Sequence, residues 1–296
     1  MITLIVPTFN RAYALKQVLD TFYTQVGVSE ILFIDDASTD ETGDVVNLFA
    51  EKYPNIKTIY LRNETNKGAS YGRKVGFEKA TNEYIMYCDD DEFLGPKYAS
   101  VCLEKLNSSG ADVVSGRHFY RDPGESFSDS IKRFGDGLLS EETFDKLRFQ
   151  IRTDAIHQSD IEVPFTHAIF ITKKELLQKY SFDTFYSKGN GFREESDFQM
   201  NLFCNGGKIL VTNDVHCVHM HLSEVKSGGQ RVNRLKRFYW TIYYTNYFLD
   251  KYFNSCKSKL GINYSKSIAK ILYLFITTYT FFIRPFFILP QRMFKS

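Results

Sequence analysis

Short runs of strand-forming residues alternate with longer segments of helical spacing over the first 117 residues of the chain. The strand-like runs lie at residues 2–6, 30–34, 56–61, 84–88 and 111–114. Helical spacing, with apolar residues every three or four positions, covers residues 12–23, 39–49, 70–80 and 96–106. Strands separated by helices of this length predict an α/β fold with a mostly parallel central sheet flanked by helices.

The pattern becomes less regular over residues 118–165, which are rich in Asp, Ser and Gly. We expect loops and short helices there, lying over the site. Periodicity then returns and predicts a strand, two helices and a further strand over residues 165–171, 173–180, 194–203 and 208–211.

The net charge of +2 conceals two parts of opposite sign. Residues 226–296 hold 13 Lys and Arg and one acidic residue, a net charge of +12, so that residues 1–225 carry −10. The same last quarter holds 18 of the 47 aromatic residues. An acidic body argues against a nucleic-acid partner, whereas a basic and aromatic segment predicts contact with a membrane surface.

The composition, with 43% hydrophobic and 24% charged residues, is that of a globular protein and excludes a disordered or polytopic membrane chain. Five scattered cysteines form neither a disulfide framework nor a CxxC zinc motif, which favours a reducing, cytoplasmic compartment. Residues 1–7 lack the basic and long apolar regions of a signal peptide.

Polar clusters follow three of the predicted strands, at residues 8–11, 35–40 and 89–92. Ligands bind at the carboxyl ends of strands in open α/β sheets, so these clusters mark the expected site. Alternate carboxylates such as Asp89 and Asp91 can converge on Mg²⁺ or Mn²⁺, which prefer oxygen ligands. A solvated acidic turn before the next helix is the alternative.

Glycines at positions 68, 72 and 76 place one helix face close to another element, and Arg73 from the same helix suits a diphosphate. Close packing of helix on sheet explains the glycines equally well. Neither a GxxxxGK[ST] loop nor a GxGxxG motif occurs, so P-loop and dinucleotide-binding folds lack their signatures.

Taken in order, six segments resemble family 2 glycosyltransferases, which have the nucleotide-diphospho-sugar transferase (GT-A) fold. They are VPTFNRA from residue 6, IDDASTDET from 34, NKGASYGR from 66, DDD from 89, GNGFREESD from 189, and VHMH from 218 with GGQR from 228. The DDD segment matches the DxD metal-binding element of that family. Glu195 stands where the family more usually has Asp.

The resemblance implies a donor site, a metal site and a catalytic base. The donor would be contacted by Pro7, Thr8, Asn10, Arg11, Asp36, Ser38, Asn66, Gly68, Arg73, Asp89 and Asp90. Asp89 and Asp91 would hold Mn²⁺ or Mg²⁺ on the diphosphate. One of His219 and His221 would complete the metal shell, and the spacing to Gly228 favours His221.

Glu195 would be the catalytic base, with Glu194 and Asp197 beside it. A metal ion and Arg73 would stabilise the charge that develops on the leaving diphosphate. A carboxylate on the opposite face would take the proton of the acceptor hydroxyl, and this in-line geometry inverts the anomeric configuration. Asp197 could instead fix Glu195 or contact the acceptor. The alternative is that these carboxylates are ordinary N-terminal helix charges.

The predicted organisation is a GT-A catalytic domain over residues 1–225, with a nucleotide-sugar half at 1–117 and an acceptor half at 118–225. Residues 226–296 would form a helical, membrane-facing extension. Its longest uncharged run, residues 271–283, is too short to span a bilayer, so we expect helices that lie on the surface. The alternative is that this extension packs on the catalytic domain or forms a homodimer interface.

These features together predict an inverting glycosyltransferase that uses a nucleotide-diphospho sugar, most simply a UDP-sugar. Its acceptor would be a glycan or lipid-linked glycan of a surface polysaccharide. We expect a peripheral protein on the cytoplasmic, inner face of the cell membrane. A non-catalytic sugar-nucleotide or membrane-binding module and a metal-dependent nucleotidyltransferase are the alternatives.

Overall fold

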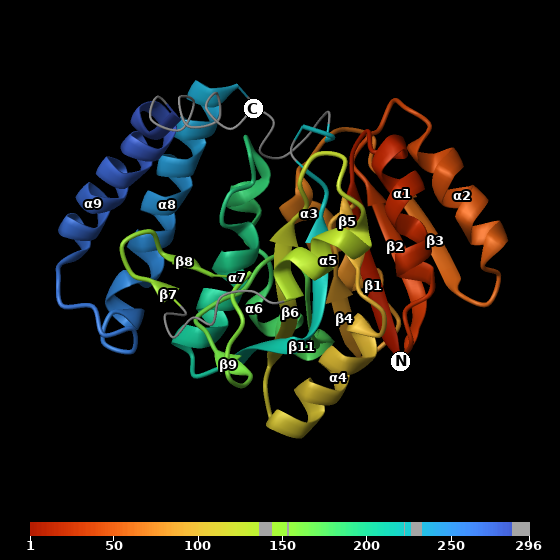
Figure 1. Ribbon diagram of the computed structural model, residues 1–296, viewed down its shortest axis with the longest axis horizontal. Coiled ribbons are helices and arrows are strands. Elements are labelled where there is room, and N and C mark those ends of the chain that lie inside the picture. Colours follow the sequence, from red (N-terminus) through yellow and green to blue (C-terminus); the bar gives the residue numbers. More distant parts are fainter. Residues whose placement is uncertain (136–143, 153, 222, 226–232, 286–296) are drawn as a thin grey trace.

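The computed structural model describes residues 1–135, 144–152, 154–221, 223–225 and 233–285 and has the predicted α/β architecture (Figure 1). Nine strands form the central sheet, in the order β3-β2-β1-β4-β10-β6-β11-β5, with β9 also paired to β11. Their bounds are β1 Ile2–Thr8, β2 Val28–Asp35, β3 Lys57–Arg62, β4 Tyr84–Tyr87, β5 Glu92–Leu94, β6 Val113–Tyr120, β9 Ile161–Glu162, β10 Phe170–Lys173 and β11 Ile209–His219. A separate small sheet pairs β7 Phe144–Asp145 with β8 Gln150–Ile151.

The sheet is mostly parallel, as predicted. Strands β1 to β4, β6 and β11 run in one direction, while β10, β5 and β9 run antiparallel to their neighbours. The strands β1, β2 and β4 therefore end at the same edge of the sheet. This edge is where the three polar clusters meet.

Helices cover both faces of the sheet (Figure 1). They are α1 Ala12–Tyr23, α2 Thr42–Lys52, α3 Ala69–Lys79, α4 Tyr98–Ser109, α5 Phe127–Gly135, α6 Lys174–Tyr180, η1 Thr184–Ser187, α7 Glu194–Cys204, α8 Arg234–Cys256, α9 Lys266–Thr278 and η3 Tyr279–Ile283. Residues of α1, α2 and α4 share one hydrophobic core, and residues of α3, α6 and α7 share another. Alternate residues of β1 enter each core, with Leu4 on one face and Ile5 on the other.

The glycine stripe on α3 has a packing role. A Cβ atom at Gly76 would lie 2.4 Å from Cγ2 of Ile5, so only glycine lets α3 approach β1 this closely. Gly68 differs, because its φ is +83° and a Cβ there would meet the carbonyl oxygen of Ser187 at 2.2 Å. Close packing therefore explains Gly76, while Gly68 brings the loop before α3 against the wall of the site.

Three elements differ from the sequence-based expectation. Strand β5 begins at Glu92, the last residue of the acidic cluster, where no strand was expected, and its backbone pairs with β11. Strand β11 extends to His219, well beyond the expected residue 211. Residues 118–165, expected as loops and short helices, include a regular strand, because β6 continues to Tyr120 alongside β11. Residues 136–143 and 153 of that segment lie outside the described residues.

The C-terminal helices α8 and α9 form a hairpin beside α7 (Figure 1). A third hydrophobic core joins this hairpin to α7 and to β7, and it contains Phe144, Phe149, Phe165, Met200, Phe248, Leu249, Tyr252 and Phe253. The extension thus packs on the rest of the chain, which was one of the two alternatives for it. The predicted domain boundary at residue 226 falls outside the described residues.

The apolar helix of the extension is longer than expected. It begins at Lys266, because the Ser265 side chain accepts a hydrogen bond from the backbone N–H of Ile268 and caps it. Residues Lys266–Ile283 are 18 in number and, among the described residues, form the one helix long and apolar enough to cross a membrane. At 1.5 Å per residue the helix is about 27 Å long.

Candidate active site

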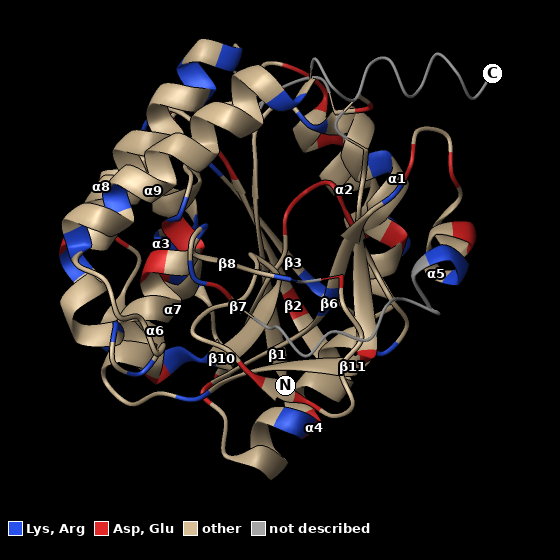
Figure 2. Cartoon of the chain, turned by 60° about the vertical axis from the view of Figure 1, so that its left-hand side comes forward, with Lys and Arg blue, Asp and Glu red and all other residues tan. Residues whose placement is uncertain are grey.

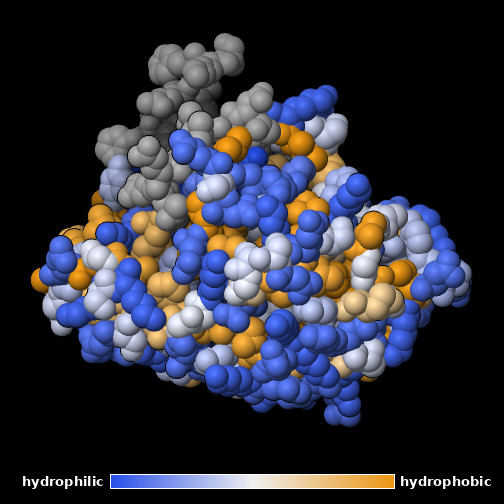
Figure 3. Space-filling view, turned by 90° about the horizontal axis from the view of Figure 1, so that it is seen from below, coloured by the Kyte–Doolittle hydropathy of each residue, from blue (hydrophilic) through white to orange (hydrophobic). Residues whose placement is uncertain are grey.

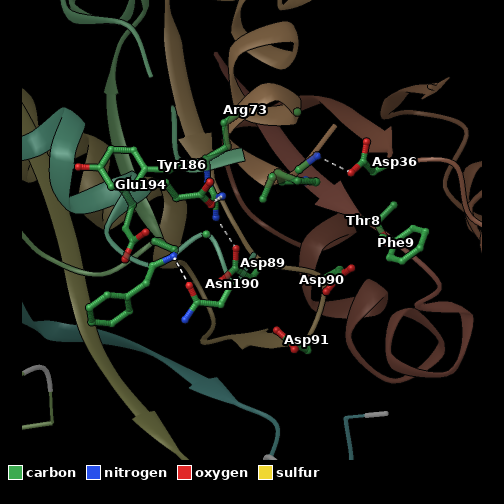
Figure 4. Close-up of a pocket in the computed structure, with 18 of the residues that line it drawn as sticks. Thr8, Phe9, Asp36, Arg73, Asp89, Asp90, Asp91, Tyr186, Asn190 and Glu194 are labelled. Carbon is green, nitrogen blue, oxygen red and sulfur yellow. Dashed lines mark hydrogen bonds and ion pairs between the residues drawn. The ribbon is translucent and has the colours of Figure 1, made fainter. Parts of the chain in front are cut away.

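A pocket of about 920 Å³ opens at the carboxyl ends of β1, β2 and β4 (Figure 4). One side is built from the segments after these strands, which contribute Thr8, Asp36 and Asp89. The opposite side is built from residues 186–195, between η1 and the first turn of α7. The pocket therefore joins the first half of the chain to the segment that precedes α7.

Arg73 lies at the centre of this pocket and joins its two sides. The guanidinium is buried, with 2% of the residue exposed. It donates one hydrogen bond to Oδ1 of Asp89 at 2.6 Å and another to Oε1 of Glu194. These carboxylates raise the pKa of Arg73 against the opposing effect of burial. Arg73 is thus held positively charged where the two sides of the pocket meet.

The acidic segment after β4 is held by a second arginine. Arg11 donates a hydrogen bond to Oδ2 of Asp91 at 2.9 Å, and its Nε lies 3.5 Å from Oδ1 of Asp90. Burial raises the pKa of Asp90 to about 7, against the opposing effect of Arg11. Asp89 is the most open of the three aspartates, with 35% of its side chain exposed. This segment is therefore an ordered, partly desolvated group of carboxylates.

Asp91, Glu92 and His219 have the geometry of a metal site. One potential ligand atom from each lies within 4.8 Å of the others. The Nδ1 atom of His219 donates to the carbonyl oxygen of Met220 at 2.6 Å. Its Nε2 lone pair, 3.5 Å from Oδ1 of Asp91, is consequently free to bind a cation.

Glu92 is the member of this group that the sequence-based prediction left out. It is fully buried and accepts a hydrogen bond at Oε1 from Nε2 of His118 at 2.9 Å. Its Oε2 atom is buried with no hydrogen-bond partner among the described residues. Two carboxylates and one imidazole suit Mn²⁺ or Mg²⁺, and an unpartnered buried carboxylate oxygen is what a bound cation would satisfy.

Two further histidines stand beside Glu92. The ring of His118 stacks on that of His167, with 4.7 Å between centroids. Burial lowers the pKa of His118 to about 4, so this imidazole is neutral and can donate one hydrogen bond. His118 is the third residue from the end of β6, but the strand predicted there ended at residue 114, so its place at the site was not recognised.

The first turn of α7 presents two carboxylates to the pocket. Glu194 accepts a hydrogen bond from Arg73, and burial raises the pKa of Glu194 while the positive charge of that arginine opposes the shift. Glu195 also lines the pocket, where it is partly exposed, and the hydrogen bond that acts on its carboxylate comes from its own backbone, whereas Glu194 is held by Arg73. Burial raises the pKa of Glu195, again opposed by Arg73. Glu195 is thus the carboxylate of this pair that remains available to a substrate.

Asp197 does not line the pocket, contrary to its predicted place among the catalytic group. Its carboxylate accepts hydrogen bonds from the Tyr186 hydroxyl at 2.9 Å and from Lys251 Nζ at 2.8 Å. Residues three or four positions apart share a helix face, whereas Asp197 is two positions after Glu195, so it lies on a different face of α7 and contacts Lys251 of α8. It connects α7 to α8 and supports Tyr186, which does line the pocket.

Asp36 lines the pocket, and its carboxylate already has hydrogen-bond donors. It accepts from the backbone N–H groups of Lys67 and Gly68, both at 2.7 Å, and from the Asn63 amide at 2.9 Å. These contacts hold the loop before α3 in place. Thr8, which lies near Asp36 in Figure 4, also lines the pocket, as does Asn66.

Asn10 and Ser38 lie behind the pocket wall and not in it. The backbone N–H of Asn10 donates to the Ser38 hydroxyl at 2.8 Å, and the Asn10 side chain accepts from the N–H of Thr39 at 2.7 Å. They hold the loops after β1 and β2 against each other.

His221 does not line the pocket either, and its Nδ1 is hydrogen-bonded to the Ser223 hydroxyl. The preference for His221 as the metal-binding histidine therefore disagrees with the geometry, which favours His219.

The remaining predicted site residues do come together. Those that line the pocket are Pro7, Thr8, Arg11, Asp36, Asn66, Gly68, Arg73, Asp89, Asp90, Asp91, Glu194, Glu195 and His219. Tyr186 and Asn190, on the opposite wall, were not predicted. Their segment has no strand-end position and no regular periodicity that would have marked them.

Comparison with known sequences agrees with this geometry. Residues 3–180, more than half of the chain, match the sequence model described as Glycosyl transferase family 2. The chain belongs to glycosyl transferase family 2. Within this family 2 glycosyltransferase, the matched region contains the acidic segment and Arg73, while α7 and its carboxylates lie beyond it.

Relatives of this family 2 glycosyltransferase share moderate identity with it. Glycosyltransferase GlyG of Streptococcus pneumoniae is 23% identical over 230 residues, which are 77% of this chain and 72% of that protein. A PGL/p-HBAD biosynthesis glycosyltransferase of Mycobacterium bovis is 26% identical over 222 residues, 74% of this chain and 75% of that protein. Glycosyltransferase GlyA of S. pneumoniae is 29% identical over 147 residues, 49% of this chain but only 20% of GlyA.

Solved structures show that the family 2 glycosyltransferase has the GT-A fold. Residues 1–349 of TarS from S. aureus, in complex with UDP, superpose with a TM-score of 0.59 at 16% identity, covering 95% of this chain and 72% of that one. The mannosyltransferase PcManGT from Pyrobaculum calidifontis, in complex with GDP-Man and Mn²⁺, gives 0.62 at 18% identity, covering 94% and 72%. At these identities the likeness establishes the fold alone.

Proposed function

We propose that the protein is an inverting, metal-dependent glycosyltransferase that moves a sugar from a nucleotide-diphospho donor, a UDP-sugar, to a hydroxyl of a glycan or lipid-linked glycan. The observation that carries this proposal is that one pocket holds a buried arginine, an acidic segment suited to a divalent cation, and an available carboxylate. Arg73 and the segment after β4 lie on one side, and Glu195 lies on the other. Such a site suits a substrate with an anionic leaving group and a neutral nucleophile.

The donor would bind across the carboxyl ends of β1, β2 and β4. Thr8 and Asp36 stand where the nucleoside would lie, and Arg73 stands where the diphosphate would lie. Asp89, Asp91 and His219, together with Glu92, would hold a divalent cation. When bound, the cation would supply positive charge to the diphosphate as it leaves. The solved structures of similar fold that contain UDP or GDP-Man with Mn²⁺ support this choice of ligand class.

The proposed reaction breaks the bond between the anomeric carbon and the β-phosphate oxygen. The acceptor oxygen forms a new bond to the anomeric carbon, its proton moves to the Glu195 carboxylate, and the electron pair of the broken bond leaves with the nucleoside diphosphate. Attack opposite the leaving group inverts the anomeric configuration. Glu194 would orient Arg73 in this scheme, because the ion pair between them fixes the guanidinium at the diphosphate position.

A surface polysaccharide is the proposed product class. A poly(ribitol-phosphate) beta-glucosyltransferase of Bacillus spizizenii is 30% identical over 119 residues, which are 39% of this chain and 19% of that protein. The relatives from M. bovis and M. tuberculosis are PGL/p-HBAD biosynthesis glycosyltransferases. The poly(ribitol-phosphate) relative supports an acceptor of polymeric kind that offers a sugar or polyol hydroxyl.

A substitution at Glu195 tests the proposal. In Glu195→Gln the side chain keeps its shape but cannot take a proton, so nucleoside diphosphate release should fall by about 10²–10⁴-fold while Mn²⁺-dependent donor binding persists. Thermal stabilisation by a panel of nucleotide sugars identifies the donor first, and chromatography of the products follows. Unchanged release in Glu195→Gln would contradict the assigned base, and release of pyrophosphate from a nucleoside triphosphate would identify a nucleotidyltransferase.

A further inference from the structure

The helices of the C-terminal hairpin each bury one stripe and expose another. In α9, Ala269, Tyr273 and Thr277 are buried at intervals of four residues. The exposed stripe of α9 and η3 consists of Ile268, Ile271, Leu274, Phe275, Tyr279 and Ile283, with exposures from 43% to 70%. The exposed stripe of α8 consists of Leu235, Tyr239 and Tyr243. Figure 3, in which the hairpin lies at the left, shows hydrophobic side chains at the surface there.

Positive charge surrounds these stripes. Lys and Arg are distributed along α8 and α9 (Figure 2), and Arg234, Lys236 and Arg284 are exposed. The single acidic residue of the hairpin, Asp250, is already paired with Lys266 at 3.1 Å and Lys270 at 2.7 Å. Apolar and aromatic side chains bordered by cations match the interface of an anionic bilayer, which offers acyl chains below and phosphate charge above.

The basic end of the hairpin is also its aromatic end. The guanidinium of Arg234 lies 5.3 Å from the ring centre of Phe282, and that of Arg237 lies 5.0 Å from the ring centre of Phe281. The start of α8 and the end of the second helix therefore form one tip. In Figure 1 this tip lies on the side of the molecule toward which β1 and β4 run, the side of the pocket.

The pocket wall is built directly on α8. Lys188 and Gly189 line the pocket, and the carbonyl oxygen of Lys188 accepts a hydrogen bond from the Tyr244 hydroxyl. A Cβ atom at Gly189 would lie 2.3 Å from the Trp240 ring, so this glycine permits a direct contact with α8. A surface that binds the exposed stripe of α8 would thus lie close to the mouth of the pocket.

We propose that the exposed stripes and basic tip of the α8–α9 hairpin dock on an anionic membrane surface, and that docking presents the pocket to a lipid-linked acceptor. This last step rests on the proposed function, whereas docking itself does not. The hairpin would lie on the bilayer and not cross it, because Asp250 and the buried stripe of α9 hold that helix against α8. The five free cysteines place this surface on the cytoplasmic side.

Flotation of the full-length chain with vesicles tests the proposal. Vesicles of phosphatidylcholine with 30% phosphatidylglycerol should carry the protein upward, vesicles of phosphatidylcholine alone much less, and salt should weaken the binding. The variants Ile271→Glu/Phe275→Glu and Arg234→Glu/Lys236→Glu should each bind at least about tenfold more weakly. Leu48→Glu on α2 and Lys16→Glu on α1, exposed and on the opposite side of the molecule, should bind like the unmodified chain.

The outcomes separate docking from its alternatives. Thermal stabilisation by donor and Mn²⁺, measured on every variant, confirms folding and reports the proposed function independently. A chain that binds donor but does not float with anionic vesicles would overturn docking. Resistance to alkaline extraction from membranes would show a span, and loss of a dimer in Ile271→Glu/Phe275→Glu without vesicle binding would show that a second copy covers the stripes; either result also overturns it.

Discussion

Arg73 and Glu194 form a buried ion pair between α3 and α7, 121 residues apart in the chain. Both side chains are almost fully buried, at 3% and 7% exposed. Breaking such a pair leaves a buried charge without a partner, which typically costs about 3–5 kcal/mol. This pair ties the donor side of the pocket to the carboxylates of the opposite wall.

We predict that Arg73→Met lowers the free energy of unfolding by about 3–5 kcal/mol, because Glu194 loses its buried partner. The double variant Arg73→Met/Glu194→Gln should lose less than the sum of the single changes. Lys52→Met is the matched control, since its pair with Asp20 is about half exposed, is screened by solvent and should contribute little to stability. Urea unfolding of the unmodified chain, the two single variants, the double variant and the control measures these differences. Strict additivity of the two changes would contradict the coupling.

The pH dependence of transfer should follow Glu195. A base must be unprotonated to act, and burial raises the pKa of this carboxyl above its ordinary value of 4.5. Activity should therefore be full at high pH and fall as the pH decreases through that raised pKa. A kcat/KM profile would show an acid limb above pH 4.5 that is absent from the residual activity of Glu195→Gln. A limb at the ordinary carboxyl pKa, or one retained in Glu195→Gln, would exclude Glu195 as the titrating base.

His219 and His221, two positions apart in the chain, provide a sharp test of the metal site. His219→Ala and Glu92→Gln should each weaken Mn²⁺ binding by at least about tenfold, because each removes an atom of the candidate metal group. His221→Ala should leave Mn²⁺ binding unchanged, since its ring is turned toward Ser223. Electron paramagnetic resonance titration of Mn²⁺ in the presence of UDP distinguishes them. Weaker binding in His221→Ala with normal binding in His219→Ala would reverse the assignment.

Lys251 and Asp197 should matter for stability more than for donor recognition. Lys251 lies 2.8 Å from Asp197 and 2.9 Å from Asp183, so Lys251→Met leaves a buried carboxylate unpaired. We predict a loss of about 3 kcal/mol in the free energy of unfolding, with donor affinity little changed. Urea unfolding measures the free energy of unfolding, and calorimetric titration measures the donor affinity. If Asp197→Asn abolished transfer at unchanged stability, Asp197 would belong to the catalytic group after all.

Much of the fold was predictable because local pattern and burial agree. The helix over residues 12–23 has the same bounds in the structure, since its apolar positions all face one core. Strand β5 was missed because three residues beginning with a glutamate form a strand only by pairing with β11, more than a hundred positions later. No local signal reports such a partner.

The site shows the same limit. The carboxylates after β4 and Arg11 after β1 were found because strand-end chemistry is local. Their contact with each other, and the contact of Glu92 with His118 of β6, form only in the folded sheet. His221 was preferred for its spacing to Gly228, but that spacing does not report where β11 ends. The strand stops at His219, and His221 lies beyond it with its ring hydrogen-bonded to Ser223.

Binding of a nucleotide sugar tests the central claim most directly. Calorimetric titration with a panel of UDP- and GDP-sugars, with and without Mn²⁺, should reveal one donor whose binding requires the metal. Binding of this donor should be lost in Asp91→Asn and retained in Glu195→Gln. If no nucleotide sugar binds in the presence of Mn²⁺, or if only nucleoside triphosphates bind, the assignment of this pocket to glycosyl transfer is contradicted.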